Sequence, residues 1–279
     1  MPEIILPPGF TETEQAMVLR YLEDVAKPGQ DWPGLVRTFA CLREAIVAIP
    51  GKGRRTFASL YTHLIDSRLT DPFITALYGL DDLEQGSVDL WRAGARRIRP
   101  LLEVAGLYAA GDPPTRFLLA YCLYWWHVTA KGYTFEVEIF RDLRRSGVSF
   151  TAHDVRLRSE RFTPYDLIVF GFRGDVKTST YFLTLTGRVL RSDFYITRLW
   201  LSKARSRTLV VFLKTPMWDE INGETPLVAW HELESCLPQP ARIVYRGEEL
   251  VVSDYEVWKE KMRAYEAQQE VQNGRTKDD

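Results

Sequence analysis

The chain has 279 residues, of which 46% are hydrophobic and 26% charged, and its formal net charge is −1. This is the composition of an ordinary globular protein, and the length allows one large domain or two smaller ones. The longest apolar run, Phe117 to Trp126, is too short to span a bilayer, and the first residues lack the basic and apolar segments of a secretory leader. Three widely separated cysteines fit neither a disulfide framework nor a zinc site. We therefore expect a cytoplasmic protein that does not associate with membranes.

The first part of the chain, residues 1–130, is predicted to be a helical domain. Apolar residues recur there at helical spacing, and breaks such as Pro28-Gly29 separate one helix from the next. The expected helices lie at about 11–27, 31–49, 56–67, 71–79, 86–107 and 115–130.

Beyond Gly132, strands are expected among the helices. Residues 131–215 should form an α/β core with the element order αβββαβ, and residues 216–270 a small mixed α/β extension that packs on it. In the core we expect a helix that Gly147 caps, strands at about 148–156, 165–170 and 175–185, a turn at Gly187, a helix at 192–205 and a strand at 208–213. In the extension we expect strands at 241–245 and 249–253, a helix at 253–269, and then a disordered tail at 271–279.

The small net charge hides a strong asymmetry along the chain. Residues 130–215 carry 16 Lys and Arg against 8 Asp and Glu, a net charge of +8. Residues 216–279 carry 7 against 14, a net charge of −7. A basic segment is expected where a polyanion approaches a protein, so the core is the part predicted to meet a nucleic acid.

Two acids and a lysine mark a candidate site in this core. Asp166 begins an apolar strand, while Asp175 and Lys177 lie two residues apart on the next strand and therefore point to the same side. Carboxylate oxygens are the ligands that Mg²⁺ prefers, and a bound cation polarises a phosphate and lowers the pKa of a water molecule. A nearby ammonium group can position that water or offset charge on the phosphate. Because neighbouring carboxylates repel one another without a cation, the pKa of one of them should be raised.

The strings Pro164-Tyr165-Asp166 and Asp175-Val176-Lys177, set in the predicted element order, resemble the PD-(D/E)xK, or restriction-endonuclease-like, nuclease superfamily. The helix before the sheet starts with Phe135-Glu136 and ends with Leu-Arg-Arg-Ser-Gly147, which is similar to the branch of methylation-dependent restriction enzymes and Holliday-junction resolvases. The resemblance covers about residues 132–215.

The resemblance implies a Mg²⁺- or Mn²⁺-dependent nuclease that hydrolyses DNA phosphodiester bonds, with RNA as a possible second substrate. It implies that Asp166 and Asp175 bind the metal, that Glu136 completes or supports the metal shell, and that Lys177 positions the attacking water. A homodimer is also implied, because cutting a duplex needs two sites.

The helix contains a second acid, Glu138, and helical spacing favours Glu136 over it. Glu136 shares a face with Phe140 and Leu143, which should pack on the sheet, whereas Glu138 faces outward with other charged residues.

The site also depends on where the hairpin between the two strands turns. A tight turn at Phe170-Gly171 brings Asp166 opposite Asp175. A turn over 171–174 instead pairs Asp166 near Ser179, too far from Asp175 to share a metal ion.

Other interpretations of these residues are open at this stage. Asp175 and Lys177 can be a solvent-facing ion pair, and the chain can be a catalytically inactive nuclease-like fold that binds a nucleic acid or a protein. The histidines show no metal-ligand spacing, and His153 is a candidate only for a phosphate contact. A group of arginines forms either a stripe that follows phosphates or a solvated face. These are Arg144, Arg145, Arg156, Arg158 and Arg161.

Overall fold

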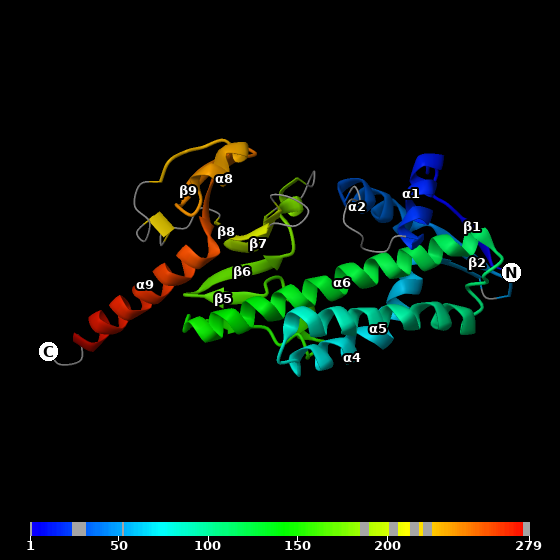
Figure 1. The fold of residues 1–279 in the computed structure, drawn as a ribbon, viewed down its shortest axis with the longest axis horizontal. Helices are drawn as coiled ribbons and strands as arrows, with labels where there is room; N and C mark the ends of the chain where they lie inside the picture. Colours follow the sequence, from blue (N-terminus) through cyan, green and yellow to red (C-terminus); the bar gives the residue numbers. More distant parts are fainter. Residues whose placement is uncertain are drawn as a thin grey trace. The chain divides into compact units, whose positions relative to one another are not determined.

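A computed structural model of the protein describes residues 2–23, 32–51, 53–184, 190–200, 206–212, 218–219 and 225–275. It shows a mixed α/β protein that divides into two compact units, Met1–Thr134 and Phe135–Asp279 (Figure 1). In the part of the chain so described, no helix is long and apolar enough to cross a membrane.

The N-terminal unit is helical, as predicted, but it also contains a small antiparallel sheet. The helices are α1 (Glu12–Glu23), α2 (Trp32–Cys41), α3 (Phe57–Leu60), the π-helical turn η2 (Tyr61–Asp66), α4 (Ser67–Tyr78) and α5 (Leu83–Val104). The strands are β1 (Glu3–Ile5), β2 (Ile46–Ile49) and β3 (Gly53–Thr56), in the order β1-β2-β3.

The helix predicted at 31–49 is wrong in its second half. Helix α2 ends at Cys41, a short 3₁₀ turn, η1 (Leu42–Glu44), follows, and Ile46–Ile49 forms strand β2. Residues 46–49 are Ile-Val-Ala-Ile, and branched side chains of this kind suit a half-buried strand that pairs on both sides. The predicted break at Pro28-Gly29 lies outside the described residues.

Helix α6 (Pro113–Ser146) is a single helix where two were predicted, at 115–130 and at the start of the core (Figure 1). The helix passes through Gly132, which costs only about 1 kcal/mol in a helix interior. It ends at Gly147, as predicted, where φ is +72° and two backbone bonds close the end. Gly147 N donates to Arg144 O at 3.2 Å, and Val148 N donates to Leu143 O at 3.1 Å.

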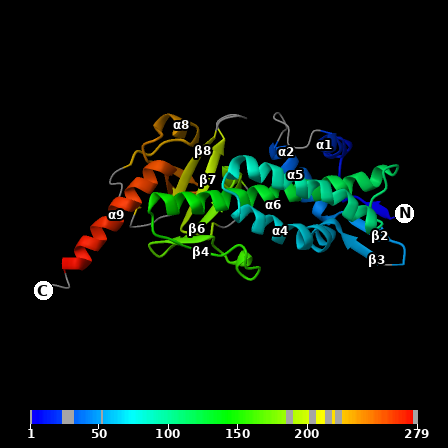
Figure 2. The ribbon, with the colours of Figure 1, turned by 60° about the horizontal axis from the view of Figure 1, so that its bottom comes forward.

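The C-terminal unit contains a seven-stranded sheet with the order β4-β5-β6-β7-β8-β10-β9. Its strands β4, β6, β7 and β8 are labelled in Figure 2. The pairs are antiparallel except for β6 and β7, which are parallel. The strands are β4 (Thr151–Ala152), β5 (Leu167–Val169), β6 (Phe172–Lys177), β7 (Phe194–Trp200), β8 (Ser206–Phe212), β9 (Ala241–Tyr245) and β10 (Glu248–Asp254). Strands β9 and β10 were expected in a separate extension, but they continue the sheet of the core.

The predicted helix at 192–205 is also wrong, because its described part forms strand β7. Residues Phe194 to Thr197 are buried on both faces of the sheet, and a strand covered on both sides lacks the alternation that identifies strands in a sequence. The described residues of the β6–β7 connection contain a 3₁₀ turn, η4 (Thr180–Thr184), and no α-helix. The predicted turn at Gly187 lies outside them. The order αβββαβ is therefore not reproduced at its second helix.

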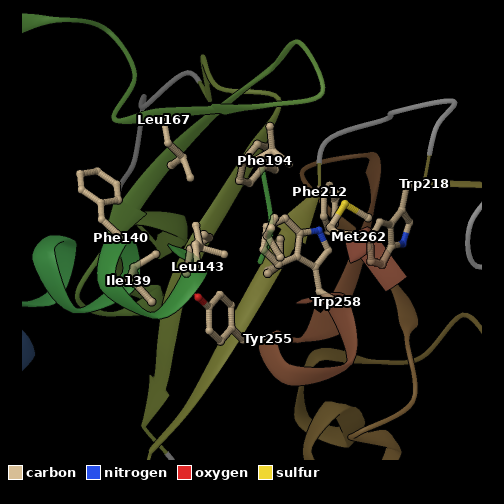
Figure 3. Close-up of a cluster of buried hydrophobic side chains, with 14 of the residues drawn as sticks. Ile139, Phe140, Leu143, Leu167, Phe194, Phe212, Trp218, Tyr255, Trp258 and Met262 are labelled. Atoms are coloured by element: carbon tan, nitrogen blue, oxygen red, sulfur yellow. The ribbon is translucent and has the colours of Figure 1, made fainter. Parts of the chain in front are cut away.

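Two layers of apolar side chains cover the two faces of the sheet. One layer joins the end of α6 to α9 (Tyr255–Arg275) across the strands, with Phe140, Phe194 and Trp258 among its buried residues (Figure 3). The other layer packs η4, α8 (Leu233–Cys236) and strands β7 to β10 together. Helix α9 extends through Arg275, so the disordered tail predicted from 271 is wrong at 271–275, and 276–279 lie outside the described residues.

The β5–β6 hairpin turns at Phe170-Gly171, the position that the candidate site requires. Both residues have positive φ, +50° and +84°, as in the two-residue turns that suit a twisted hairpin. The register pairs Leu167 with Gly174 and Val169 with Phe172. Continued by one residue, this register sets Asp166 opposite Asp175.

Gly174 lies under the ring of Phe194, so it tests how closely the hairpin packs on the core. A Cβ atom at Gly174 would fall well inside van der Waals contact with that ring, whereas one at Gly111 would meet nothing within 4 Å. We expect Gly174→Ala to lower the free energy of unfolding by about 1–3 kcal/mol. Gly111→Ala should change it by less than ~0.5 kcal/mol. Urea unfolding followed by tryptophan fluorescence measures both, and equal effects would contradict the packing described here.

Candidate functional site

The hairpin brings the two strand acids into one place. Asp166 N donates to Gly174 O at 2.8 Å, and Val176 N donates to Asp166 Oδ2 at 2.6 Å. The Asp166 carboxylate is therefore tied to the strand that carries Asp175 and Lys177. The Lys177 ammonium forms an ion pair with Asp175, whose side chain is only 14% exposed.

Helix α6 contributes Glu136 to this group. Its side chain is 11% exposed, and the residues one and two turns further on, Phe140 and Leu143, are buried in the core against the sheet. Glu138 is 45% exposed and forms an ion pair with Arg198 at 2.6 Å. Glu136 thus lies beside the strand acids, whereas Glu138 pairs with Arg198 outside the group, in agreement with the choice that helical spacing favours.

His153 is the residue that the sequence did not single out as a metal ligand. It directly follows strand β4, and its backbone N donates to Asp166 O at 3.1 Å. Its Nε2 forms a hydrogen bond with Glu136, and its Nδ1 lies 3.9 Å from Asp166 Oδ1. Histidine spacing could not reveal this position, because the contact depends on which strands pair. The one signal in the sequence was that His153 lies in the strand predicted immediately before that of Asp166.

Three of these side chains form a group that could hold a metal ion. Glu136, His153 and Asp166 each offer one ligand atom, and the three atoms lie within 4.8 Å of one another. Asp175, predicted as a ligand, is not in this group and instead faces Lys177 and Asp166. This group therefore contains two of the three predicted ligands, with Asp175 beside it, and adds a nitrogen donor.

The charges of the site act on one another strongly. Burial, and then the negative charges of Glu136 and Asp175, raise the pKa of Asp166 from 3.8 to about 8, which confirms the expected raised carboxyl pKa. Burial alone would lower the pKa of His153, but its hydrogen bond to Glu136 and the nearby charges of Glu136 and Asp166 raise it. Without a cation, Asp166 and His153 therefore hold their protons to a higher pH than usual, and these protons balance part of the negative charge.

Two arginines of the predicted stripe, Arg156 and Arg161, bind groups in their own loop between β4 and β5. Arg156 binds both carboxylate oxygens of Asp154, with its Nε 2.9 and 3.1 Å from them. Arg161 donates to the carbonyl groups of Val155 and Arg156. Of the remaining three, Arg144 lies over the ring of Phe150, Arg145 donates to Arg141 O at 3.4 Å, and Arg158 is exposed.

No family model matches the chain, and neither a search of curated proteins nor a search of solved structures finds a similar protein. The chemistry of the site therefore has to come from the geometry and charges of its own residues.

The raised pKa of Asp166 predicts a pH-dependent stability in metal-free buffer. The folded protein keeps a proton that the unfolded chain releases, so the free energy of unfolding should fall as the pH rises from about 4 to about 8. The raised pKa of His153 acts in the same direction at the upper end of this window. Asp166→Asn retains an oxygen that accepts from Val176 N but has no proton to lose, so its free energy of unfolding should decline less with pH. At pH 9 it should exceed that of the wild type by on the order of 2 kcal/mol.

Urea unfolding in EDTA between pH 4 and 9 measures this difference. Glu138→Gln is the matched control, because it removes one negative charge from a side chain outside the cluster. A parallel pH profile for wild type and Asp166→Asn would show that Asp166 is ionised throughout.

Proposed function

We propose that this protein is a metal-dependent nuclease that hydrolyses DNA phosphodiester bonds, with a core of the restriction-endonuclease-like kind. One observation carries the proposal. The turn at Phe170-Gly171 sets Asp166 beside Asp175 and Lys177, while α6 and β4 bring Glu136 and His153 to the same carboxylate. Acids, a nitrogen donor and an ammonium group in one partly buried cluster suit a divalent cation and a phosphate.

The roles follow from the position of each side chain. Glu136 and Asp166 hold the cation, which when bound polarises the phosphate and lowers the pKa of a coordinated water. Lys177 is 28% exposed, so its ammonium group can reach a phosphate while Asp175 fixes its direction. Paired in this way, Lys177 acts as a positive charge that offsets the charge developing on the phosphate and orients the water.

A polyanionic substrate is supported by the charge of the segment around the site. Residues 130–215 carry a net charge of +8, although the whole chain carries −1. A homodimer would supply the two sites needed to cut both strands of a duplex. The order of α6, β4, β5 and β6 supports the restriction-endonuclease-like core, and the β6–β7 connection departs from it.

A second candidate function is a binding module of the same fold without catalysis. The site balances its charges internally, because His153 bonds Glu136, Lys177 pairs with Asp175, and Asp166 has a raised pKa. Such a cluster can remain stable without a cation. Calorimetric titration with Mn²⁺ separates the two functions, because the nuclease requires binding that Glu136→Gln weakens, whereas the module requires none.

Plasmid cleavage tests the proposed function directly. With Mg²⁺ or Mn²⁺, the wild-type protein should nick or linearise supercoiled plasmid. Glu136→Gln, Asp175→Ala and Lys177→Ala should each lower the rate at least ~100-fold, because they remove a group that holds the cation, the carboxylate that directs Lys177, and the ammonium that offsets developing charge, respectively. EDTA should abolish cleavage.

Glu138→Gln is the matched control on the same helix and should retain activity within about fivefold, because its carboxylate pairs with Arg198 and lies outside the acidic cluster. An RNA of the same sequence, assayed in parallel, decides between DNA and RNA as substrate. Equal cleavage by wild type and Glu136→Gln would refute the proposal.

A further inference from the structure

The imidazole of His153 is held in one orientation from three sides. Its Nδ1 lies 3.0 Å from Thr163 Oγ1 and 3.2 Å from the carbonyl oxygen of Tyr165. The ring of Phe140 meets it edge to face at 6.1 Å, and the side chain is only 6% exposed. The ring is therefore fixed before any ligand binds.

In this orientation Nε2 is the ring nitrogen that contacts Glu136. A carbonyl oxygen can only accept, so the contact with Tyr165 O is a hydrogen bond when Nδ1 carries a proton. Histidines that bind metals usually donate one ring N–H to a backbone carbonyl or carboxylate, which fixes the tautomer and presents the other nitrogen to the metal. Nε2 contacts Glu136, and the ligand atoms that Glu136, His153 and Asp166 offer lie within 4.8 Å of one another, close enough to share one ion.

Building on the proposed function, we infer that His153 is a nitrogen ligand of the catalytic cation and that the site selects a first-row transition metal over Mg²⁺. Mg²⁺ favours all-oxygen surroundings and keeps several of its waters. An imidazole beside two carboxylates instead favours ions that bind nitrogen, with affinity rising from Mn²⁺ through Co²⁺ to Ni²⁺. The Mg²⁺ expected from the acids alone would then be a weaker occupant than Mn²⁺.

A different role for the same histidine is that of a permanent counter-ion. In that case a protonated His153 balances Glu136, no metal binds Nε2, and the fixed orientation serves only the fold. The two roles differ in whether a bound metal has a nitrogen in its coordination shell.

Pulsed electron paramagnetic resonance of bound Mn²⁺ reads that shell directly. The wild-type protein with Mn²⁺ should show echo modulation from a directly coordinated ¹⁴N, and incorporation of ¹⁵N-labelled histidine should replace it with the ¹⁵N pattern. This arm needs no substitution, so it does not depend on whether a variant folds.

Calorimetric titration with Mg²⁺, Mn²⁺ and Co²⁺ supplies the second arm. His153→Gln keeps an amide that can reach Glu136 but has no nitrogen ligand, so it should weaken Mn²⁺ and Co²⁺ binding at least about tenfold and leave Mg²⁺ binding nearly unchanged. The matched control is His231→Gln, which alters an exposed histidine far along the sequence from the cluster and should change none of these affinities.

The outcomes separate this inference from the proposed function. Mn²⁺ bound without nitrogen modulation, or modulation that survives in His153→Gln, would overturn the ligand role while leaving Glu136-dependent cleavage intact. If bound Mn²⁺ shows nitrogen modulation but the protein cleaves no nucleic acid, the ligand role of His153 is supported and the proposed nuclease function is wrong. If Mn²⁺ does not bind at all, both are wrong.

Discussion

Phe170 adopts a left-handed backbone conformation at the tip of the β5–β6 hairpin, and with Gly171 it sets the register of the two strands that carry the site acids. This conformation costs a non-glycine residue about 1–2 kcal/mol. The ring of Phe170 packs edge to face on Tyr265 of α9 at 5.3 Å, and an aromatic pair of this kind contributes roughly 0.5–1.5 kcal/mol, which offsets most of that cost. A slip of one residue would turn Asp166 to the opposite face of the sheet, so the candidate site exists only in this register.

Given that register, the structure concentrates negative charge in a partly buried place and balances it by two different means. Lys177 neutralises Asp175 through an ion pair, whereas Glu136 shares a hydrogen bond with the imidazole of His153. Asp166 lies between these two pairs and has only a raised pKa to relieve the repulsion. Under the proposed function, a divalent cation at Asp166 would balance this charge in place of the proton.

The parts predicted correctly from the sequence are those that local chemistry determines. Helical spacing distinguishes Glu136 from Glu138, and the requirement for positive φ identifies Gly147 as the end of α6. The errors lie where tertiary contacts override local signals. Strand β7 is buried on both faces and so lost the alternation that marks a strand, and His153 reaches the site only through the pairing of β4 with β5. Which strands pair is decided in the folded sheet, so it cannot be predicted from the spacing of residues along the sequence.

The contact between Phe170 and Tyr265 also has a consequence for the order in which the protein is made. Every residue of the candidate site leaves the ribosome before β8, β10 and α9, yet these later elements complete the sheet and the apolar layer against which the hairpin packs. A nascent chain that ends before α9 carries all the site side chains without the apolar layer on which their hairpin packs. The side chains of the candidate site are therefore synthesised before the elements that hold them in place, and the site is assembled only after α9 has been made.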